Sequence, residues 1–117
     1  MRVAVTGGRS FTDKALLIEV LSHYKITSLL HGGCTGVDKM AAEWAANIGI
    51  DVVLFKANWD QYGAIAGPVR NAKMLRNGKP DLLIAFTGGK GTANCKAQAK
   101  ELGIPVIVIE NPKEKVA

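Results

Sequence analysis

The chain has 117 residues, of which 48% are hydrophobic and 21% are charged, and its formal net charge is +5. This length suits one domain with a sizeable core, and no apolar run approaches the ~20 residues of a membrane span. Two distant cysteines do not make a disulfide framework, and a strand that starts at residue 2 leaves no room for a signal peptide, so we expect a cytoplasmic protein. The positive charge favours anionic partners without separating a nucleotide from a nucleic acid.

Short β-rich runs alternate with longer helical patterns, which is typical of a parallel sheet with crossover helices. We expect strands near 2–6, 27–31, 51–55, 81–86 and 104–109, and helices near 12–24, 36–48, 67–77 and 92–102. Gly49 and Gly103 should end the second and the last helix. Between the third strand and the third helix, residues 56–66 read as a long loop that carries Trp59 and Tyr62.

Right-handed crossovers restrict how these elements connect and predict the strand order 3-2-1-4-5. The chain is therefore expected to form a single Rossmann-like α/β domain over residues 1–110, doubly wound, with a five-stranded parallel sheet and helices on both faces. Residues 111–117 read as a polar tail. In such sheets, ligands bind at the carboxyl ends of the strands, where the strand order reverses.

Three of the apolar runs end in a pair of glycines, namely Gly7-Gly8, Gly32-Gly33 and Gly88-Gly89. A strand, a glycine turn and a helix start together form the usual phosphate cradle, because an anion can touch the bare backbone while the helix supplies free N–H groups. Three such turns on one edge of a sheet predict a ligand of nucleotide type.

The third turn is the most informative of these. Gly88, Gly89 and Gly91 permit a tight backbone nest, Lys90 adds a positive charge, and Thr92 offers either a helix cap or a hydroxyl for a phosphate. The segment matches neither the P-loop nor the dinucleotide fingerprint. A simple strand-to-helix turn capped by threonine is the alternative.

The other two turns carry further candidates. After the first turn come Arg9 and Ser10, and Ser10 to Asp13 has the spacing of a capping box in its Asp form. In the second, Gly32, Gly33, Thr35, Gly36 and Asp38 follow a strand that ends in His31, which we interpret as a local hydrogen-bonding residue. Thr35 and Asp38 either close a second capping box, or the Asp38 carboxylate holds a ribose hydroxyl or a metal ion. With only two histidines and two cysteines, well separated, no metal site is expected.

Arg70 and Asn71 form the remaining candidate pair. We expect Arg70 in the first turn of a helix, where the helix dipole disfavours a cation unless an anion is bound. Asn71 adds a donor and an acceptor beside it. Trp59 and Tyr62, just upstream, either stack on a base or pack within their loop.

In combination, these segments resemble the SLOG superfamily, the Rossmann-like domains named after the Smf/DprA and Lonely Guy proteins, and most closely its small YspA-related branch. The matching segments cover nearly the whole chain: Thr6-Gly7-Gly8-Arg9, Gly32 to Asp38, Trp59, Gly67-Pro68-Val69-Arg70-Asn71 and Gly88-Gly89-Lys90-Gly91-Thr92. The resemblance implies a pocket for a nucleotide or a nucleotide-derived ligand.

Lonely Guy enzymes cleave the N-glycosidic bond of a nucleoside monophosphate and carry the signature P-G-G-x-G-T-x-x-E. Here Thr87 replaces the proline, Cys95 stands at the glutamate position, and Arg70 is the counterpart of an upstream arginine. A thiol cannot replace that carboxylate in stabilising a ribosyl cation or positioning water. The resemblance therefore favours binding over hydrolysis.

From the sequence we expect a module that binds or senses a nucleotide derivative, such as an ADP-ribose-like molecule or a signalling nucleotide, with no cofactor required. A nucleotide N-glycosidase or phosphoribohydrolase that uses Asp38 and Arg70 is the alternative. Nucleic-acid binding, as in the DNA-processing relatives, is less favoured because basic and aromatic residues do not interleave. The resemblance also implies a homodimer, since family members often dimerise, and the aromatic loop together with the third helix is the candidate surface.

Overall fold

A computed structural model describes residues 1–110, and the tail predicted for 111–117 lies outside them. The elements in chain order are β1 (Arg2–Thr6), α1 (Lys14–Ser22), β2 (Ser28–His31), α2 (Val37–Asn47), β3 (Asp51–Leu54), α3 (Trp59–Tyr62), the 3₁₀ helix η1 (Gly63–Ile65), α4 (Ala66–Arg76), β4 (Leu82–Phe86), α5 (Lys90–Glu101) and β5 (Val106–Ile109). All strand pairs are parallel and the order is β3-β2-β1-β4-β5, which confirms the predicted topology.

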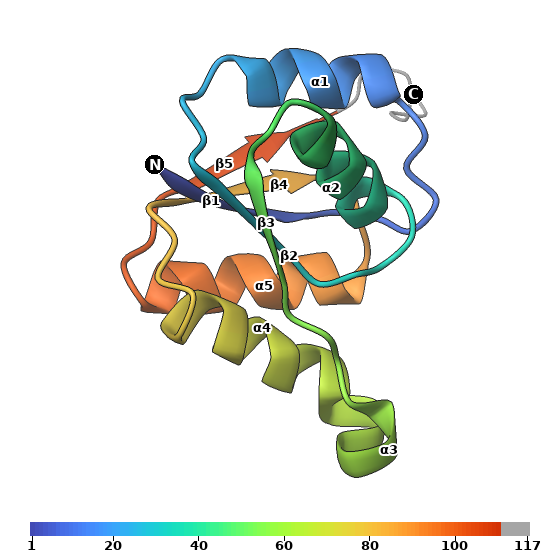
Figure 1. Cartoon of the computed structure of the whole chain (residues 1–117). Coiled ribbons are helices and arrows are strands. Elements are labelled where there is room, and N and C mark those ends of the chain that lie inside the picture. Colours follow the sequence, from blue (N-terminus) through green and yellow to red (C-terminus); the bar gives the residue numbers. More distant parts are fainter. Residues whose placement is uncertain (111–117) are drawn as a thin grey trace.

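Helices cover both faces of the sheet, with α1 and α2 on one side and α4 and α5 on the other (Figure 1). The central strand β1 shows why. Val3 and Val5 belong to the core beneath α1 and α2, whereas Ala4, which lies between them, belongs to the core beneath α4 and α5. Because alternate side chains of a strand point to opposite faces, a strand that is apolar throughout supplies both cores.

The ends of the helices follow the glycine signals better than the capping signals. Gly49 after α2 and Gly103 after α5 have φ values of +82° and +73°, as expected of glycines that end a helix. The capping box predicted for α1 is wrong. The helix starts at Lys14, and the Asp13 side chain caps it by accepting a hydrogen bond from the Leu16 amide at 3.1 Å.

The segment predicted as a long loop is partly helical. Asn58 accepts a hydrogen bond from the Gln61 amide at 3.0 Å and thereby starts α3, which η1 then joins to α4. Pro68 lies in the first turn of α4, where a residue without an N–H group is tolerated. In Figure 1, α3 projects from the body of the domain beyond the end of α4.

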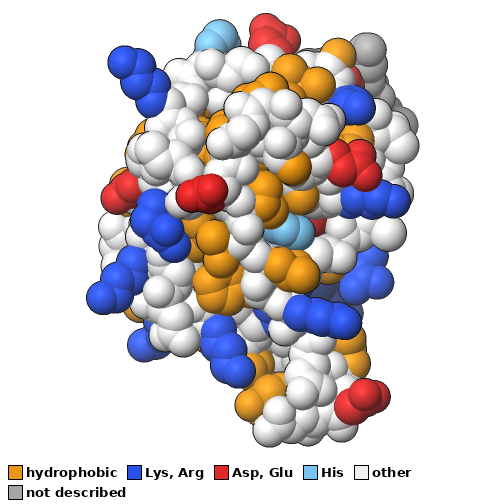
Figure 2. Space-filling model, viewed as in Figure 1, with side chains coloured by type: hydrophobic (Ala, Val, Ile, Leu, Met, Phe, Trp, Pro, Cys, Tyr) orange, Lys and Arg blue, Asp and Glu red, His pale blue; other side chains and the backbone are white. Residues whose placement is uncertain are grey.

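Several large hydrophobic side chains are exposed, among them Val52 and Leu54 on the edge strand β3 and Trp59 and Ile65 in the segment around α3. Figure 2 shows hydrophobic side chains gathered on the face that carries β3, with Lys and Arg side chains around them. The predicted homodimer stays a prediction. Within residues 1–110, no helix is long and apolar enough to cross a bilayer.

Candidate functional site

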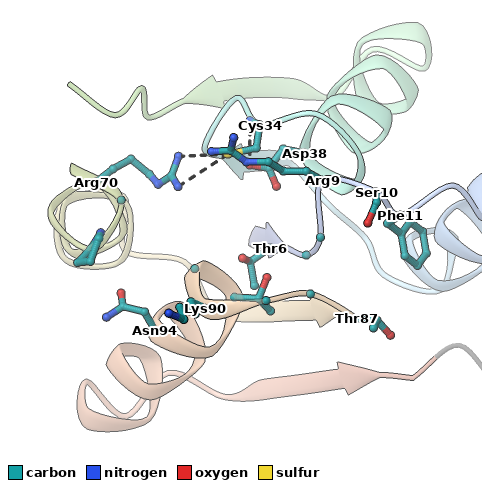
Figure 3. A pocket seen from close by; sticks show the side chains of 18 of the residues that line it. Thr6, Arg9, Ser10, Phe11, Cys34, Asp38, Arg70, Thr87, Lys90 and Asn94 are labelled. Atoms are coloured by element: carbon teal, nitrogen blue, oxygen red, sulfur yellow. Dashed lines mark hydrogen bonds between the residues drawn. The ribbon is translucent and has the colours of Figure 1, made fainter. Parts of the chain in front are cut away.

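The turns that follow β1, β2 and β4 meet at one edge of the sheet, because parallel strands place all their carboxyl ends there. A cavity of about 910 Å³ opens at this edge. It lies between the turns after β1 and β4 on one side and the start of α4 on the other (Figure 3). It has the volume of a small-molecule site.

Most of the residues predicted as site residues line this cleft: Gly7, Gly8, Arg9, Ser10, Asp38, Trp59, Arg70, Gly88, Gly89, Lys90, Gly91 and Thr92. Five others do not line it: Gly32, Gly33, Thr35, Gly36 and Asn71. The cleft therefore collects residues from four separate segments, but the second glycine turn reaches it only through Cys34 and Asp38.

The turn between β4 and α5 is the open one. A Cβ atom built on Gly89 or Gly91 would meet nothing within 4 Å. Gly89 is the N-cap of α5 and brings no side-chain cap, and the amides of Lys90 and Gly91 donate to no described residue. These free N–H groups and the positive end of the helix dipole lie at the cleft, which makes the turn suitable for an anion.

Thr92 does not cap this helix, so the capping alternative is wrong. It is the third residue of α5, it is buried, and its Oγ1 packs so closely against Gly88 that a Cβ atom there would collide with it. The turn after β1 also packs against the turn after β4, because the Gly8 amide donates a hydrogen bond to the Thr87 carbonyl at 2.8 Å. Gly8 and Gly88 therefore allow two turns to pack together beneath the cleft.

The turn between β2 and α2 is closed by the protein's own groups. Asp38 Oδ2 accepts hydrogen bonds from the Gly32 amide at 3.0 Å and from the Cys34 amide at 3.3 Å. Gly36, with φ of +77°, packs against the carbonyl groups of Gly8 and Arg9, where a Cβ atom would collide. Of the two alternatives for Thr35 and Asp38, the capping box is wrong, because Gly36 is the N-cap and the Asp38 carboxylate bonds amides further upstream.

Asp38 is the acidic residue of the cleft lining. Its side chain is buried, and this burial raises the pKa of its carboxyl group, although the amides of Cys34 and Gly32 and the charges of Arg70 and Arg9 act in the opposite direction. Both described hydrogen bonds use Oδ2. Oδ1 is therefore available to accept a hydrogen bond from a ligand hydroxyl.

Arg70 joins the cleft to the second turn. Its Nη1 donates to the Gly32 carbonyl at 2.7 Å, and its two Nη atoms lie 4.0 and 3.9 Å from Cys34 Sγ. Arg70 is the fifth residue of α4 and so lies beyond the first turn that was predicted for it. The argument from the helix dipole applies instead to Lys90, the first residue of α5.

For three further residues named from the sequence, the structure shows the neighbours or the contact with the cleft. His31 is buried and its Nδ1 accepts from the Gly33 amide at 3.1 Å, which confirms the predicted local hydrogen bond; burial, and then the charge of Arg70, lower the pKa of its imidazole. Tyr62 does not line the cleft, and Lys73 Nζ lies 5.8 Å from the centroid of its ring. Trp59 does line the cleft and is half exposed.

Cys95 occupies the position of the Lonely Guy glutamate but lies in the core under α4 and α5. It is fully buried and does not line the cleft, and burial raises the pKa of its thiol to about 11. A neutral, packed thiol at this position has no catalytic chemistry to offer. Among residues 1–110, no group of three His, Cys, Asp or Glu side chains is placed to hold a metal ion.

The sequence interpretation missed several lining residues, among them Thr6, Phe11, Ala64 and Asn94. Asn94 follows Lys90 by four residues, and helical spacing places such residues on one face, so the signal was present. Phe11 and Ala64 carry no comparable signal, because apolar side chains beside a turn read as core residues.

Comparisons with known proteins identify the family of the chain. The model of the YspA, cpYpsA-related SLOG family matches residues 1–62. The gene 61 protein of Mycobacterium phage D29 is 36% identical to this chain over an alignment of 119 positions. The alignment covers 91% of this chain and 94% of the phage protein.

The chain is therefore a member of the YspA/cpYpsA-related SLOG family, whose members are associated with nucleotide-related ligands. The family match covers the first two glycine turns, Asp38 and Trp59, whereas Arg70 and the open turn after β4 lie beyond it.

Proposed function

We propose that the protein binds a nucleotide-derived ligand, such as an ADP-ribose-like molecule or a signalling nucleotide, in the cleft at the carboxyl edge of its sheet. The observation that carries this proposal is the open turn between β4 and α5, whose amides have no acceptor in the described part of the protein. Arg9, Lys90 and Arg70 line the same cleft, and Asp38 is the acidic residue among them. This charge balance favours an anionic ligand.

In the proposed complex, each part of the ligand has a counterpart. A phosphate group lies against the amides at the start of α5, with Arg9 and Lys90 beside it. Asp38 Oδ1 accepts a hydrogen bond from a ribose hydroxyl, and the half-exposed Trp59 offers a face for a base.

Titration calorimetry with inorganic pyrophosphate, AMP, ADP and ADP-ribose tests this proposal. We expect at least one compound to bind, and Arg70→Ala to weaken its binding by about tenfold, because the cleft loses one of the positive charges that attract an anionic ligand. Arg76→Ala removes the same charge from the far end of α4 and should leave binding unchanged. Failure of all four compounds to bind the wild-type protein would refute the proposal.

An N-glycosidase is the second candidate, and Asp38 is the observation that favours it. The raised pKa of this buried carboxyl group is a feature of many catalytic acids and bases, and the group faces the cleft. The chemistry would release a base from a nucleoside monophosphate, which chromatography can follow. Asp38→Asn should abolish that release; base release that survives this change and Arg70→Ala would reject the assignment of these residues.

A further inference from the structure

The side chains of Arg70, Asn71, Asn94 and Gln98 form a continuous hydrogen-bonded chain between α4 and α5. Arg70 Nε donates to Asn71 Oδ1 at 2.9 Å, and Asn71 Nδ2 donates to Asn94 Oδ1 at 3.1 Å and to the Gly91 carbonyl at 3.3 Å. From the other side, Gln98 Nε2 donates to Asn94 Oδ1 at 2.7 Å and to the Pro68 carbonyl at 3.1 Å.

This chain fixes which way each amide group points. An arginine side chain has donors only, so the atom of Asn71 that faces Arg70 must be the oxygen. Its nitrogen then faces the Gly91 carbonyl, which is an acceptor only, and Asn94. The Pro68 carbonyl fixes the Gln98 amide in the same way, because only a nitrogen can donate to it. Two amide nitrogens therefore converge on Asn94, and the atom they meet must be its oxygen.

Asn94 is left with one unused polar group. Its oxygen accepts from Asn71 and from Gln98, whereas its Nδ2 donates to no residue within 1–110. Asn94 lines the cleft and Asn71, which is buried, does not. In Figure 3, Asn94 and Lys90 lie on the same helix, with the Arg70 helix facing them.

We infer that Asn94 is a ligand-binding residue that donates a hydrogen bond from Nδ2 to an anionic oxygen of the ligand, and that Asn71 and Gln98 are positioning residues that hold its amide in this orientation. The inference rests on the proposed function and deepens it. The anionic oxygen then lies along the start of α5, on the helix that also carries Lys90. This also gives Asn71 a role that differs from the predicted ligand contact.

The test is titration with ADP and with inorganic pyrophosphate. Asn94→Ala removes the donor without adding charge, and Asn71 and Gln98 keep the Gly91 and Pro68 carbonyls as partners. We expect the dissociation constant to rise about fivefold. Asn94→Asp keeps an oxygen for Asn71 and Gln98 but turns the free donor into an acceptor, so the rise should be about tenfold or more. Asn47→Asp, at the last residue of α2, adds the same charge away from the cleft and should leave binding unchanged.

A direct readout separates contact from stability. The side-chain NH₂ resonances of Asn94 in an amide NMR spectrum, assigned by their loss in Asn94→Ala, should shift when ADP is added. Wild-type affinity in both Asn94 variants, or unshifted resonances in the presence of bound ADP, would overturn the inference while leaving the proposed function intact. If the wild-type protein binds neither probe nor any other compound of the panel, the proposed function fails first and the inference falls with it.

Discussion

Two turns with the same sequence signature, a strand that ends in a pair of glycines before a helix, have opposite environments in this protein. In the turn between β2 and α2, Asp38 and Arg70 bond the backbone, and Gly36 packs against the turn after β1. In the turn between β4 and α5, Gly89 and Gly91 face open space and the first amides of the helix are free. The protein's own groups fill the turn after β2, whereas the turn after β4 is open to a ligand. A glycine pair in the sequence thus indicates that another group can come close to the backbone. It does not tell whether that group belongs to the protein or to a ligand.

The largest expected effect breaks this comparison at its glycines. Gly36→Ala should lower the free energy of unfolding by about 3 kcal/mol, because the new methyl group collides with the Gly8 and Arg9 carbonyls at a positive φ. Gly91→Ala, in the first turn of α5, should raise stability by about 0.5 kcal/mol, since alanine favours the helix and the space is open. Denaturant unfolding measures both. Equal losses in the two variants would contradict the contrast between a closed and an open turn.

The two thiols sharpen the comparison next. Cys34 lines the cleft beside the closed turn and is partly exposed, whereas Cys95 lies buried below the open turn with a pKa raised to about 11. Because the thiolate is the reactive form, Cys34 should react with a disulfide reagent at pH 8 at least about 100-fold faster than Cys95. Cys34→Ser and Cys95→Ala assign the two phases. A single phase with two equivalent thiols would mean that Cys95 is accessible.

Charge at the open turn comes third. Lys90→Gln should weaken ADP binding by about fivefold, as expected for the loss of one partly screened charge contact. The same change should leave the melting temperature unchanged or slightly higher, because a cation at a helix N-terminus is unfavourable. Lys100→Gln, in the last turn of the same helix, is the matched control and should not alter binding. Equal effects on binding from both variants would place the anion elsewhere.

The smallest expected effect concerns the pH dependence of stability. Burial raises the Asp38 pKa above its ordinary value of 3.8, so the folded state holds this proton to higher pH than the unfolded state does. The contribution of Asp38 to stability is therefore fully present below pH 3.8 and is lost as the pH rises through the folded-state pKa. Asp38→Asn removes this loss. Urea unfolding between pH 3 and pH 8 should show the stability of the wild type falling relative to the variant, and parallel profiles would exclude the raised pKa.

The sequence predicted the fold closely, and particular residues show why. The continuous apolar run from Leu82 to Phe86 requires cover on both sides, and the crossover rule then left little choice of strand order. Gly49 and Gly103 marked helix ends correctly, because their positive φ is a local property. The capping boxes failed because Asp13 and Asp38 each had another backbone amide within reach, and which one they bond depends on the path of the chain.

The candidate site divides in the same way. Residues whose role follows from local chemistry, such as the glycines and Lys90 of the turn after β4, were found from the sequence and line the cleft. Asn71 was expected to contact a ligand but is buried, and Asn94 was missed although it lines the cleft. Both placements depend on the packing of α4 against α5, which no spacing within one segment encodes.

The order of the amino acids alone determined the strands, the helices that cover the sheet and the edge at which three turns had to meet, because apolar runs, glycines and right-handed crossovers act locally or through simple chain geometry. Only the tertiary structure decided which turn is filled and which is open. That choice depends on Arg70 reaching Gly32 across 38 positions of sequence and on Asn71 bonding α5. Such long-range hydrogen bonds exist only once α4 has packed against α5 and against the turn after β2.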